Sequence, residues 1–202
     1  VGSEMCIRDR RNNIQTMMQG LQAMKDSAAL LVYWDGEASD ISWPEPCIVE
    51  YVTNGQGGIN SLSKGTIDAM MADKNTSIYD LIGIGNIRKK YPPQTSTEKT
   101  VMQTVIGDMM SAYPSESYGI IFGSHGSGWL PTITGTRSIG QDGGRYSSDT
   151  ALIPELAEVL RTVNPQKFDF VLFDACMMGC AEVYYELKDA AKYCIASVLD
   201  IC

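Results

Sequence analysis

Residues 168–179 read Phe-Asp-Phe-Val-Leu-Phe-Asp-Ala-Cys-Met-Met-Gly, an apolar run followed by a turn that carries Cys176. A short run of aromatic and β-branched residues with a turn after it predicts a buried strand over 168–173. A similar run, Tyr118-Gly-Ile-Ile-Phe122, predicts a strand that ends just before the chain's only histidine, His125. The sequence thus places a thiol and an imidazole at the carboxyl ends of two strands. In open α/β sheets, ligands bind at that edge.

Strand and helix patterns alternate along the rest of the chain. Further strands are predicted at 29–34, at 47–52 and from about Tyr193. Apolar residues at helical spacing predict helices near 14–24, 67–71, 98–112, 154–163 and 181–191. The third of these opens on Thr95-x-x-Glu98, which has the form of a capping box. Residues 74–94 receive no assignment, and residues 131–150 are predicted to form a long exposed loop. This alternation predicts an α/β fold with a mostly parallel sheet that helices cover on both faces.

The composition is that of an ordinary globular domain, with 202 residues, of which 44% are hydrophobic and 20% charged. The net charge of −8 argues against nucleic-acid binding, which needs clustered Lys and Arg, and favours a cationic substrate. No apolar run approaches the roughly 18 residues of a membrane span. The six cysteines have no framework spacing, which predicts buried small hydrophobes, with Cys176 as the exception.

The two ends of the chain are treated separately from its fold. Residues 1–10 lack the apolar stretch of a signal peptide and resemble translated adapter sequence, so we expect a non-native or disordered segment there. The chain stops at Cys202, at the end of an apolar run, so we expect truncation at the C-terminus. The predicted domain therefore covers residues 11–202.

The two turns carry the groups of a cysteine acyl-transfer site. A thiol at a strand-to-helix junction is expected near a helix N-terminus, which favours the nucleophilic thiolate of Cys176. The imidazole of His125 is suited to protonating the leaving group, because it changes charge in the physiological range. The backbone N–H groups of Gly126 and Cys176 are candidates for an oxyanion site. A packed core thiol and a structural histidine remain the alternatives. The spacing of 51 residues between His125 and Cys176 is that of caspase-type enzymes.

The sequences His125-Gly-Ser-Gly-Trp129 and Asp174-Ala-Cys-Met-Met-Gly179 resemble the clostripain family of cysteine peptidases, relatives of caspases, gingipains and legumain. The resemblance covers roughly residues 28–202. It implies a caspase-like three-layer α/β/α sandwich and a cysteine endopeptidase with a Cys176–His125 dyad. The turn reads Ala-Cys-Met-Met-Gly and departs from the caspase signature, so the aspartate specificity of caspases is not implied.

The resemblance also implies specificity for peptide or protein substrates with Arg or Lys before the scissile bond. One carboxylate of the acidic specificity pocket lies two residues before the nucleophile, which is Asp174 here. A helix N-cap is the alternative role for Asp174. The second pocket acid of the family lies downstream of the nucleophile, where Asp200 is a weak candidate.

Members of the family are commonly secreted zymogens that cleave themselves between the two motifs. Within the predicted loop at 131–150, Arg137 and Arg145 are candidate cleavage sites, and a solvated loop with incidental arginines is the alternative. Some relatives need calcium, but the stretch at 142–144 does not match an EF-hand loop, so calcium rests on the resemblance alone. With one histidine and scattered cysteines, no metal or other cofactor is predicted.

Two other functions stay open at this point. The chain is either a peptidase, an inactive peptidase-like binding module, or a thiol redox protein that uses Cys176 and Cys180. Trp34 and Trp129 are candidates for walls of the cleft, although packing residues near strand ends are the simpler interpretation.

Overall fold

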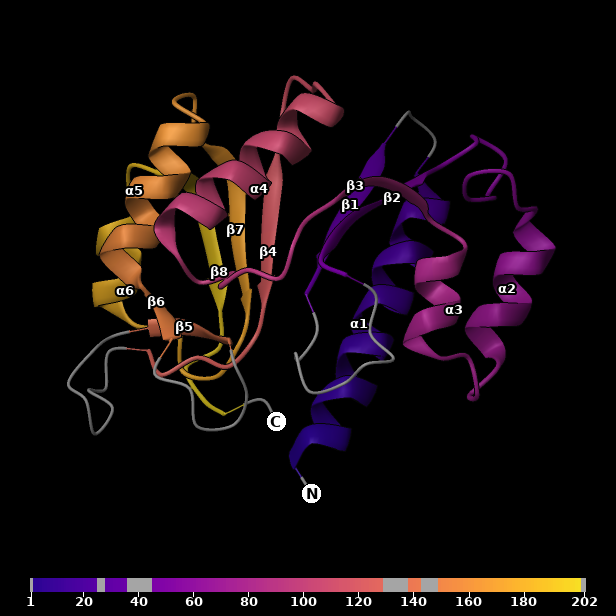
Figure 1. Cartoon of the computed structure of the whole chain (residues 1–202), viewed down its shortest axis with the longest axis horizontal. Coiled ribbons are helices and arrows are strands. Elements are labelled where there is room, and N and C mark those ends of the chain that lie inside the picture. The colour runs from indigo at the N-terminus through magenta and orange to yellow at the C-terminus, as the bar shows by residue number, and fades with distance from the viewer. Residues whose placement is uncertain (1, 25–27, 36–44, 129–137, 143–148, 201–202) are drawn as a thin grey trace. The chain divides into compact units, whose positions relative to one another are not determined.

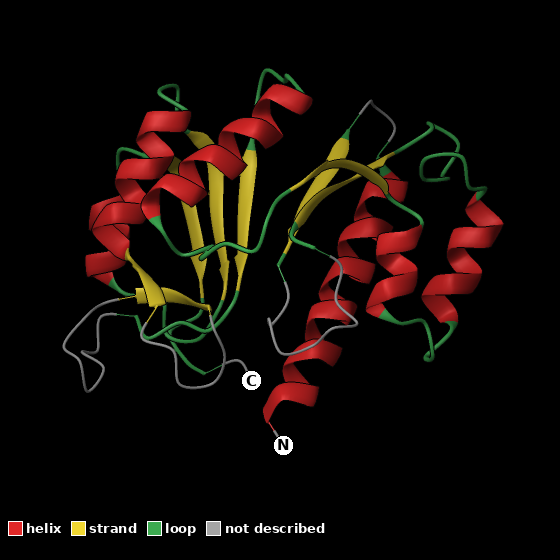
Figure 2. Cartoon of the chain, viewed as in Figure 1, coloured by secondary structure: helices red, strands yellow, loops and turns green. Residues whose placement is uncertain are grey.

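A computed structural model describes residues 2–24, 28–35, 45–128, 138–142 and 149–200 of the chain (Figure 1). The chain divides into two compact units, one ending at Pro93 and the other starting at Gln94. Each unit combines helices with β-sheet (Figure 2) and has its own hydrophobic core. The predicted α/β fold class is confirmed.

The described residues of the first unit form three helices and an antiparallel sheet with the strand order β1-β2-β3. Its elements are α1 (Gly2–Ala23), β1 (Ala29–Trp34), β2 (Cys47–Val52), α2 (Lys64–Ala72), α3 (Ile78–Gly83) and β3 (Asn86–Lys90). The bounds of β1 and β2 are those predicted. Strand β1 is an unbroken apolar run, β2 is apolar apart from Glu50, and a turn signal follows each strand. The predicted parallel pairing is confined to the second unit. Helix α1 begins at Gly2, so it includes the residues left out of the fold prediction.

The core of the first unit forms between helix α1 and the central strand β2. Ile14, Met18 and Leu21 of α1 share one hydrophobic cluster with buried residues of the sheet. Trp34 is 7% exposed within this cluster, so it is a packing residue and not a wall of an open cleft. The buried carboxylate of Glu50 accepts a hydrogen bond from Arg88 at 2.8 Å, which offsets the cost of burying the charge.

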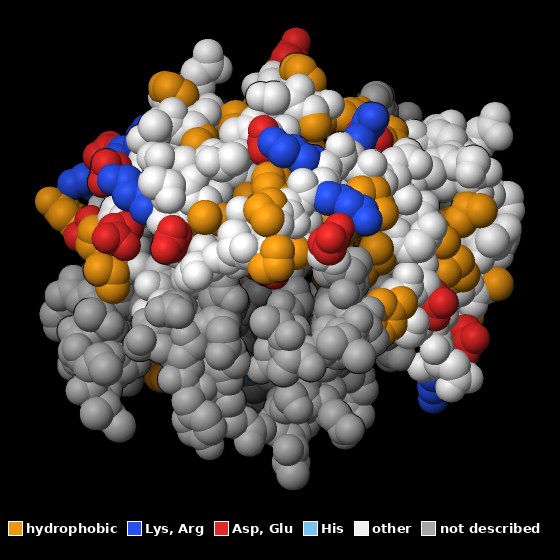
Figure 3. Space-filling model, viewed as in Figure 1, with side chains coloured by type: hydrophobic (Ala, Val, Ile, Leu, Met, Phe, Trp, Pro, Cys, Tyr) orange, Lys and Arg blue, Asp and Glu red, His pale blue; other side chains and the backbone are white. Residues whose placement is uncertain are grey.

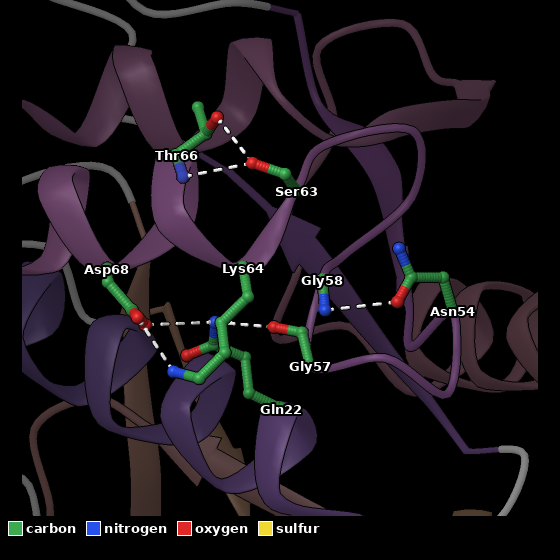
Figure 4. Close-up of polar contacts among 8 residues, drawn as sticks. All are labelled: Gln22, Asn54, Gly57, Gly58, Ser63, Lys64, Thr66 and Asp68. Atoms are coloured by element: carbon green, nitrogen blue, oxygen red, sulfur yellow. Dashed lines mark hydrogen bonds and ion pairs between the residues drawn. The ribbon is translucent and has the colours of Figure 1, made fainter.

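Polar contacts attach helix α1 to the turn after β2 and to helix α2 (Figure 4). The side-chain amide of Gln22 donates to the carbonyl oxygen of Gly57 at 2.8 Å and to Asp68 at 3.3 Å. Lys64 forms an ion pair of 2.7 Å with Asp68. Within the turn, the side chain of Asn54 accepts a hydrogen bond from the backbone of Gly58 at 3.0 Å. These bonds satisfy backbone groups that a loop would otherwise leave unpaired.

The segment without a sequence assignment contains α3 and β3. Helix α3 begins with a true capping box, in which Ser77 and Asp80 exchange hydrogen bonds between side chain and backbone. The capping box predicted at residues 95–98 is wrong. The N-cap of the next helix is Glu98, and it makes no side-chain capping bond. The spacing of polar residues alone did not distinguish the two sites, because an N-cap is defined by backbone conformation as well as by residue type.

The second unit is built on a three-stranded parallel sheet with the order β4-β7-β8. Its elements are α4 (Lys99–Ala112), β4 (Gly119–Gly123), β5 (Ser138–Asp142), β6 (Asp149–Leu152), α5 (Ile153–Val163), β7 (Phe168–Asp174), α6 (Ala181–Leu187) and β8 (Ala191–Ala196). Helices α4 and α5 lie on the near face of this sheet in Figure 1. Helix α5 turns Leu156, Val159 and Leu160 into the core, as predicted. The opposite face of the sheet carries Tyr193 and Ile195, which are 72% and 51% exposed.

The predicted loop at 131–150 is not a continuous loop. Its described residues form strand β5 and the start of strand β6, which pair as an antiparallel ladder. Sequence reasoning missed this hairpin because its Gly- and Ser-rich composition is typical of turns. Residues 131–137 and 143–148 lie outside the described part of the chain.

The surface carries both signs of charge. On the face shown in Figure 3, Lys and Arg side chains lie beside Asp and Glu side chains. Among the described residues, Lys99 forms an ion pair of 2.5 Å with Glu158, and Lys192 forms one of 2.5 Å with Asp169. None of the described helices is long and apolar enough to cross a bilayer.

Candidate active site

Parallel pairing of β4 with β7 brings the histidine turn and the cysteine turn to one edge of the sheet. Gly123, the last residue of β4, pairs with Asp174, the last residue of β7. His125 and Cys176 each lie two residues beyond this pair. Because parallel strands run in the same direction, both turns leave the sheet at its carboxyl edge.

The backbones of the histidine turn and the cysteine turn are in direct contact. The N–H of Ser124 donates to the carbonyl oxygen of Asp174 at 3.3 Å. A Cβ atom added at Gly126 would lie 2.6 Å from the carbonyl oxygen of Cys176. At Gly128, where φ is +55°, it would lie 2.1 Å from the carbonyl oxygen of Met177. Both glycines therefore permit an approach that any other side chain would prevent.

The turns rest on an apolar floor. The rings of Phe122 and Phe173, which precede the turns, stack with centroids 5.8 Å apart. Met178 is fully buried, and its sulfur would lie 3.0 Å from a Cβ atom at Gly126. Above this floor His125 is exposed and Cys176 is partly exposed. Neither residue is fully buried.

The pairing of the histidine turn with strand β5 fixes the direction of the backbone N–H of Gly126 relative to that strand. Gly126 and Ile139 form an isolated antiparallel bridge, and the N–H of Gly140 donates to the carbonyl oxygen of His125 at 2.9 Å. In this pairing pattern the hydrogen bonds flank the bridged residues, so the N–H of Gly126 points away from β5.

Asp174 ends strand β7 at the same edge. Its Oδ2 atom lies 4.0 Å from the position of a Cβ atom at Gly123, so the carboxylate lies over that glycine, and its side chain is partly buried. The alternative role of Asp174 as a helix N-cap is wrong. The N-cap of α6 is Cys180, six residues further along the chain.

The expected helix N-terminus at Cys176 is also wrong. Helix α6 begins at Ala181, and residues 175–180 form a turn that includes Met177 at a φ of +54°. The field of a helix dipole acts on groups at the helix terminus. The residue at the N-terminus of α6 is its N-cap, Cys180, and not Cys176. Support for Cys176 as the nucleophile therefore comes from its place beside the histidine turn.

Burial shifts the pKa of two other described cysteines, Cys47 and Cys194. Burial raises the pKa of the Cys194 thiol to about 11, and burial likewise raises the pKa of Cys47. Such thiols are poor nucleophiles at neutral pH, in agreement with the predicted core role. No disulfide joins Cys176 to Cys180 in the structure.

Several predicted residues fall outside the described part of the chain. Trp129, Arg137 and Arg145 belong to this group. Asp200 is described and exposed, and it follows Leu199, whose carbonyl oxygen accepts a hydrogen bond of 3.2 Å from the N–H of Met177. The chain therefore passes beside the cysteine turn just before Asp200.

Sequence reasoning missed the residues that support the two turns. Met178 packs under the histidine turn, and Ile139 and Gly140 of β5 contact its backbone. A buried methionine after a strand gives no distinguishing signal. The contact with β5 could not be predicted, because a Gly- and Ser-rich segment is typical of turns and does not indicate a strand. The described residues hold no cluster of three or more His, Cys, Asp or Glu side chains suited to a metal ion.

The chain matches known proteins along nearly its whole length. The model of the clostripain family, Peptidase C11, matches residues 7–201. Among solved structures, a secreted C11 cysteine protease from Bacteroides thetaiotaomicron in complex with an irreversible peptide inhibitor is 29% identical, with a TM-score of 0.65. An inactive zymogen C11 protease from Parabacteroides distasonis is 25% identical, with a TM-score of 0.64. A further C11 protease from Bacteroides thetaiotaomicron, iotapain, shares the fold at 20% identity and a TM-score of 0.70.

These matches cover unequal shares of the proteins compared. They cover 96%, 95% and 97% of this chain but 45%, 44% and 49% of the three solved chains, in the order given. The chain thus spans less than half the length of these structures. No curated protein matches it.

Proposed function

The chain belongs to the clostripain family, and on this premise we propose that it is a cysteine endopeptidase that cleaves after Arg or Lys. The observation that carries the proposal is the register of β4 with β7, in which His125 and Cys176 each follow the Gly123–Asp174 pair by two residues. A peptidase of this type needs a thiol and an imidazole that face one substrate bond.

The proposed reaction has two stages. The thiolate of Cys176 attacks the carbonyl carbon of the scissile bond, and the oxyanion accepts hydrogen bonds from the N–H groups of Gly126 and Cys176. Protonated His125 donates its proton to the departing amine as the C–N bond breaks, which leaves a thioester. Water, deprotonated by His125, then attacks the thioester, and the Cys176 thiolate is released with the acid product.

Asp174 supplies the proposed specificity for a basic side chain. Its carboxylate lies at the same sheet edge as Cys176, two residues away along the chain. A carboxylate beside the scissile bond pairs with an Arg or Lys cation through charge-assisted hydrogen bonds. The net charge of −8 favours the approach of cationic peptides.

Self-processing is proposed at Arg137 or Arg145. Both lie in segments that flank strand β5 along the chain, between the histidine and cysteine motifs. The zymogen state of the Parabacteroides distasonis relative supports a precursor form. Sequencing the N-termini that appear when purified protein is incubated tests this point. Cleavage only outside 131–150, or cleavage that persists in Cys176→Ala, would refute it.

The proposed reaction uses only groups of the chain itself, so no cofactor is proposed. We place the protein outside the cytoplasm, on the strength of its likeness to a secreted relative.

A panel of fluorogenic peptides with Arg, Lys, Asp, Asn or Gly before the scissile bond tests the proposal. Wild type is expected to hydrolyse the Arg and Lys peptides, Cys176→Ala to hydrolyse none, and the matched thiol control Cys180→Ser to retain activity. Asp174→Asn is expected to lower kcat/KM for the basic peptides selectively. A folded wild type that hydrolyses nothing, and whose Cys176 resists a basic chloromethyl ketone, would refute peptidase activity.

A further inference from the structure

Strand β5 contains an irregularity directly beside the histidine turn. Ile139 pairs with Ala151 and Asp142 pairs with Asp149, so β5 has one more residue than β6 between these pairs. The extra residue makes a β-bulge, and Gly140 within it has a φ of +81°. Bulges with a glycine in the left-handed region bend a strand and redirect its backbone groups.

The bulge directs one backbone group to the histidine turn. The N–H of Gly140 donates a hydrogen bond of 2.9 Å to the carbonyl oxygen of His125. The preceding residue, Ile139, bridges Gly126, and its side chain is only 4% exposed in the core of the second unit. Strand β5 is thus anchored in the core and holds the backbone at His125 and Gly126.

This anchor matters because the imidazole itself is exposed. The regular pairing of β4 ends at Gly123, and beyond it the turn is held on one side by the bond from Ser124 to Asp174. The bond from Gly140 to His125 holds the other side. An exposed side chain has few contacts of its own, so its position follows that of its backbone.

We infer that the Gly140 bulge positions His125 for proton transfer, which makes Gly140 a positioning residue of the histidine turn. The expected effect on catalysis rests on the proposed peptidase function. The expected effect on the position of His125 rests on the structure alone. It assigns a role to a hairpin that contributes no side chain to the proposed chemistry.

Glycine is favoured at this position for two separable reasons. A φ of +81° is strained for most L-residues, whereas Asn tolerates the left-handed region better than Ala. A Cβ atom at Gly140 would also lie 3.0 Å from the Cγ2 methyl group of Thr97. The substitution Thr97→Ser removes that methyl group. The double variant Gly140→Asn with Thr97→Ser is therefore the conservative replacement.

Steady-state kinetics on the fluorogenic Arg peptide tests the catalytic consequence. Gly140→Ala is expected to lower kcat by about 10-fold to 100-fold with KM within about twofold, because small errors in the position of a catalytic group are costly. Gly140→Asn with Thr97→Ser is expected to recover much of the loss. Gly55→Ala is the matched control, since Gly55 has a φ of +74° in the first unit and no atom within 4 Å of the added Cβ.

The single histidine provides a readout that does not depend on activity. With only one histidine in the chain, the ¹³Cε1–¹Hε1 NMR signal of His125 needs no assignment. Gly140→Ala is expected to move or split this signal, and the conservative double variant to restore it, while Gly55→Ala leaves it unchanged. A His125 signal and a kcat that both stay at wild-type values in folded Gly140→Ala would overturn the inference. A wild type without activity would refute the proposed function instead, and the NMR signal would still decide the geometric claim.

Discussion

Replacing Gly126 by Ala should separate the histidine turn from the cysteine turn. The added Cβ atom would lie 2.6 Å from the carbonyl oxygen of Cys176, about 0.8 Å short of ordinary van der Waals contact at 3.4 Å. The obstacle is backbone, which cannot rotate away as a side chain can. The two turns must therefore move apart by a large part of 0.8 Å, which raises the energy of the folded state by about 1–3 kcal/mol.

The same displacement is expected to slow catalysis. A misplacement of about 1 Å costs on the order of 10²-fold in rate, so a shift of up to about 0.8 Å should lower the rate by roughly 10-fold to 10²-fold. The loss should appear in kcat for the fluorogenic Arg peptide, in protein whose thermal unfolding shows that it is folded. Gly107→Ala in α4 is the matched control, because an added Cβ there meets no atom within 4 Å. It should keep full activity and raise stability by about 0.5–1 kcal/mol, since Ala favours helix more than Gly.

A second variant separates the two contacts at Gly126. Met178→Ala removes the sulfur atom that lies 3.0 Å from the added Cβ but leaves the Cys176 carbonyl in place. The double variant should therefore remain as inactive as Gly126→Ala alone. Wild-type activity in folded Gly126→Ala would refute the contact between the two turns. Rescue by Met178→Ala would show that the side-chain contact, and not the backbone, sets the spacing.

Three further outcomes are expected. Leu156→Ala empties a fully buried position in α5 and should lower the free energy of unfolding by about 2–5 kcal/mol in urea titrations; a loss below 1 kcal/mol would contradict the described core. The hydrogen bond from Lys192 lowers the pKa of Asp169, so this pair stabilises the fold above the carboxylate's unfolded pKa near 3.9, and the contribution is lost as pH falls through the lower folded pKa. The Tm difference between wild type and Lys192→Ala should shrink below about pH 4, and a constant difference would exclude the pair as its cause. Excess EDTA should leave hydrolysis of the Arg peptide unchanged, and loss of activity that calcium restores would show that the proposed chemistry is incomplete.

The sequence predicted best where one physical signal dominated. Strands β1 and β2 were predicted to the residue, because short, largely apolar runs with turn signals after them leave few alternatives. Helix α5 was predicted with its inward face, because Pro fits the first turn and apolar residues recur on one side. Prediction failed for β5, where the pairing partner and not the composition makes the strand.

In the candidate site, too, local features were predicted and contacts between distant segments were not. The turns after two predicted strands and their spacing identified His125 and Cys176 as candidates, the resemblance to the clostripain family added Asp174, and the glycines beside the histidine indicated close backbone approach. The predicted helix field at Cys176 was wrong, because the length of the turn before α6 is not encoded in a local signal. The supports from Met178 and Gly140 could not be predicted, because each acts on a residue distant in the chain.

By itself, the sequence determined which side chains are candidates for chemistry and which segments form most of the regular elements, because residue type and apolar period are local properties. Only the tertiary structure decided that Gly123 pairs with Asp174, and hence that the imidazole and the thiol leave the sheet at one edge. It also decided that a bulge in β5 donates a hydrogen bond to the histidine turn. Strand register and bulges depend on contacts between distant segments, and no local pattern in the chain specifies them.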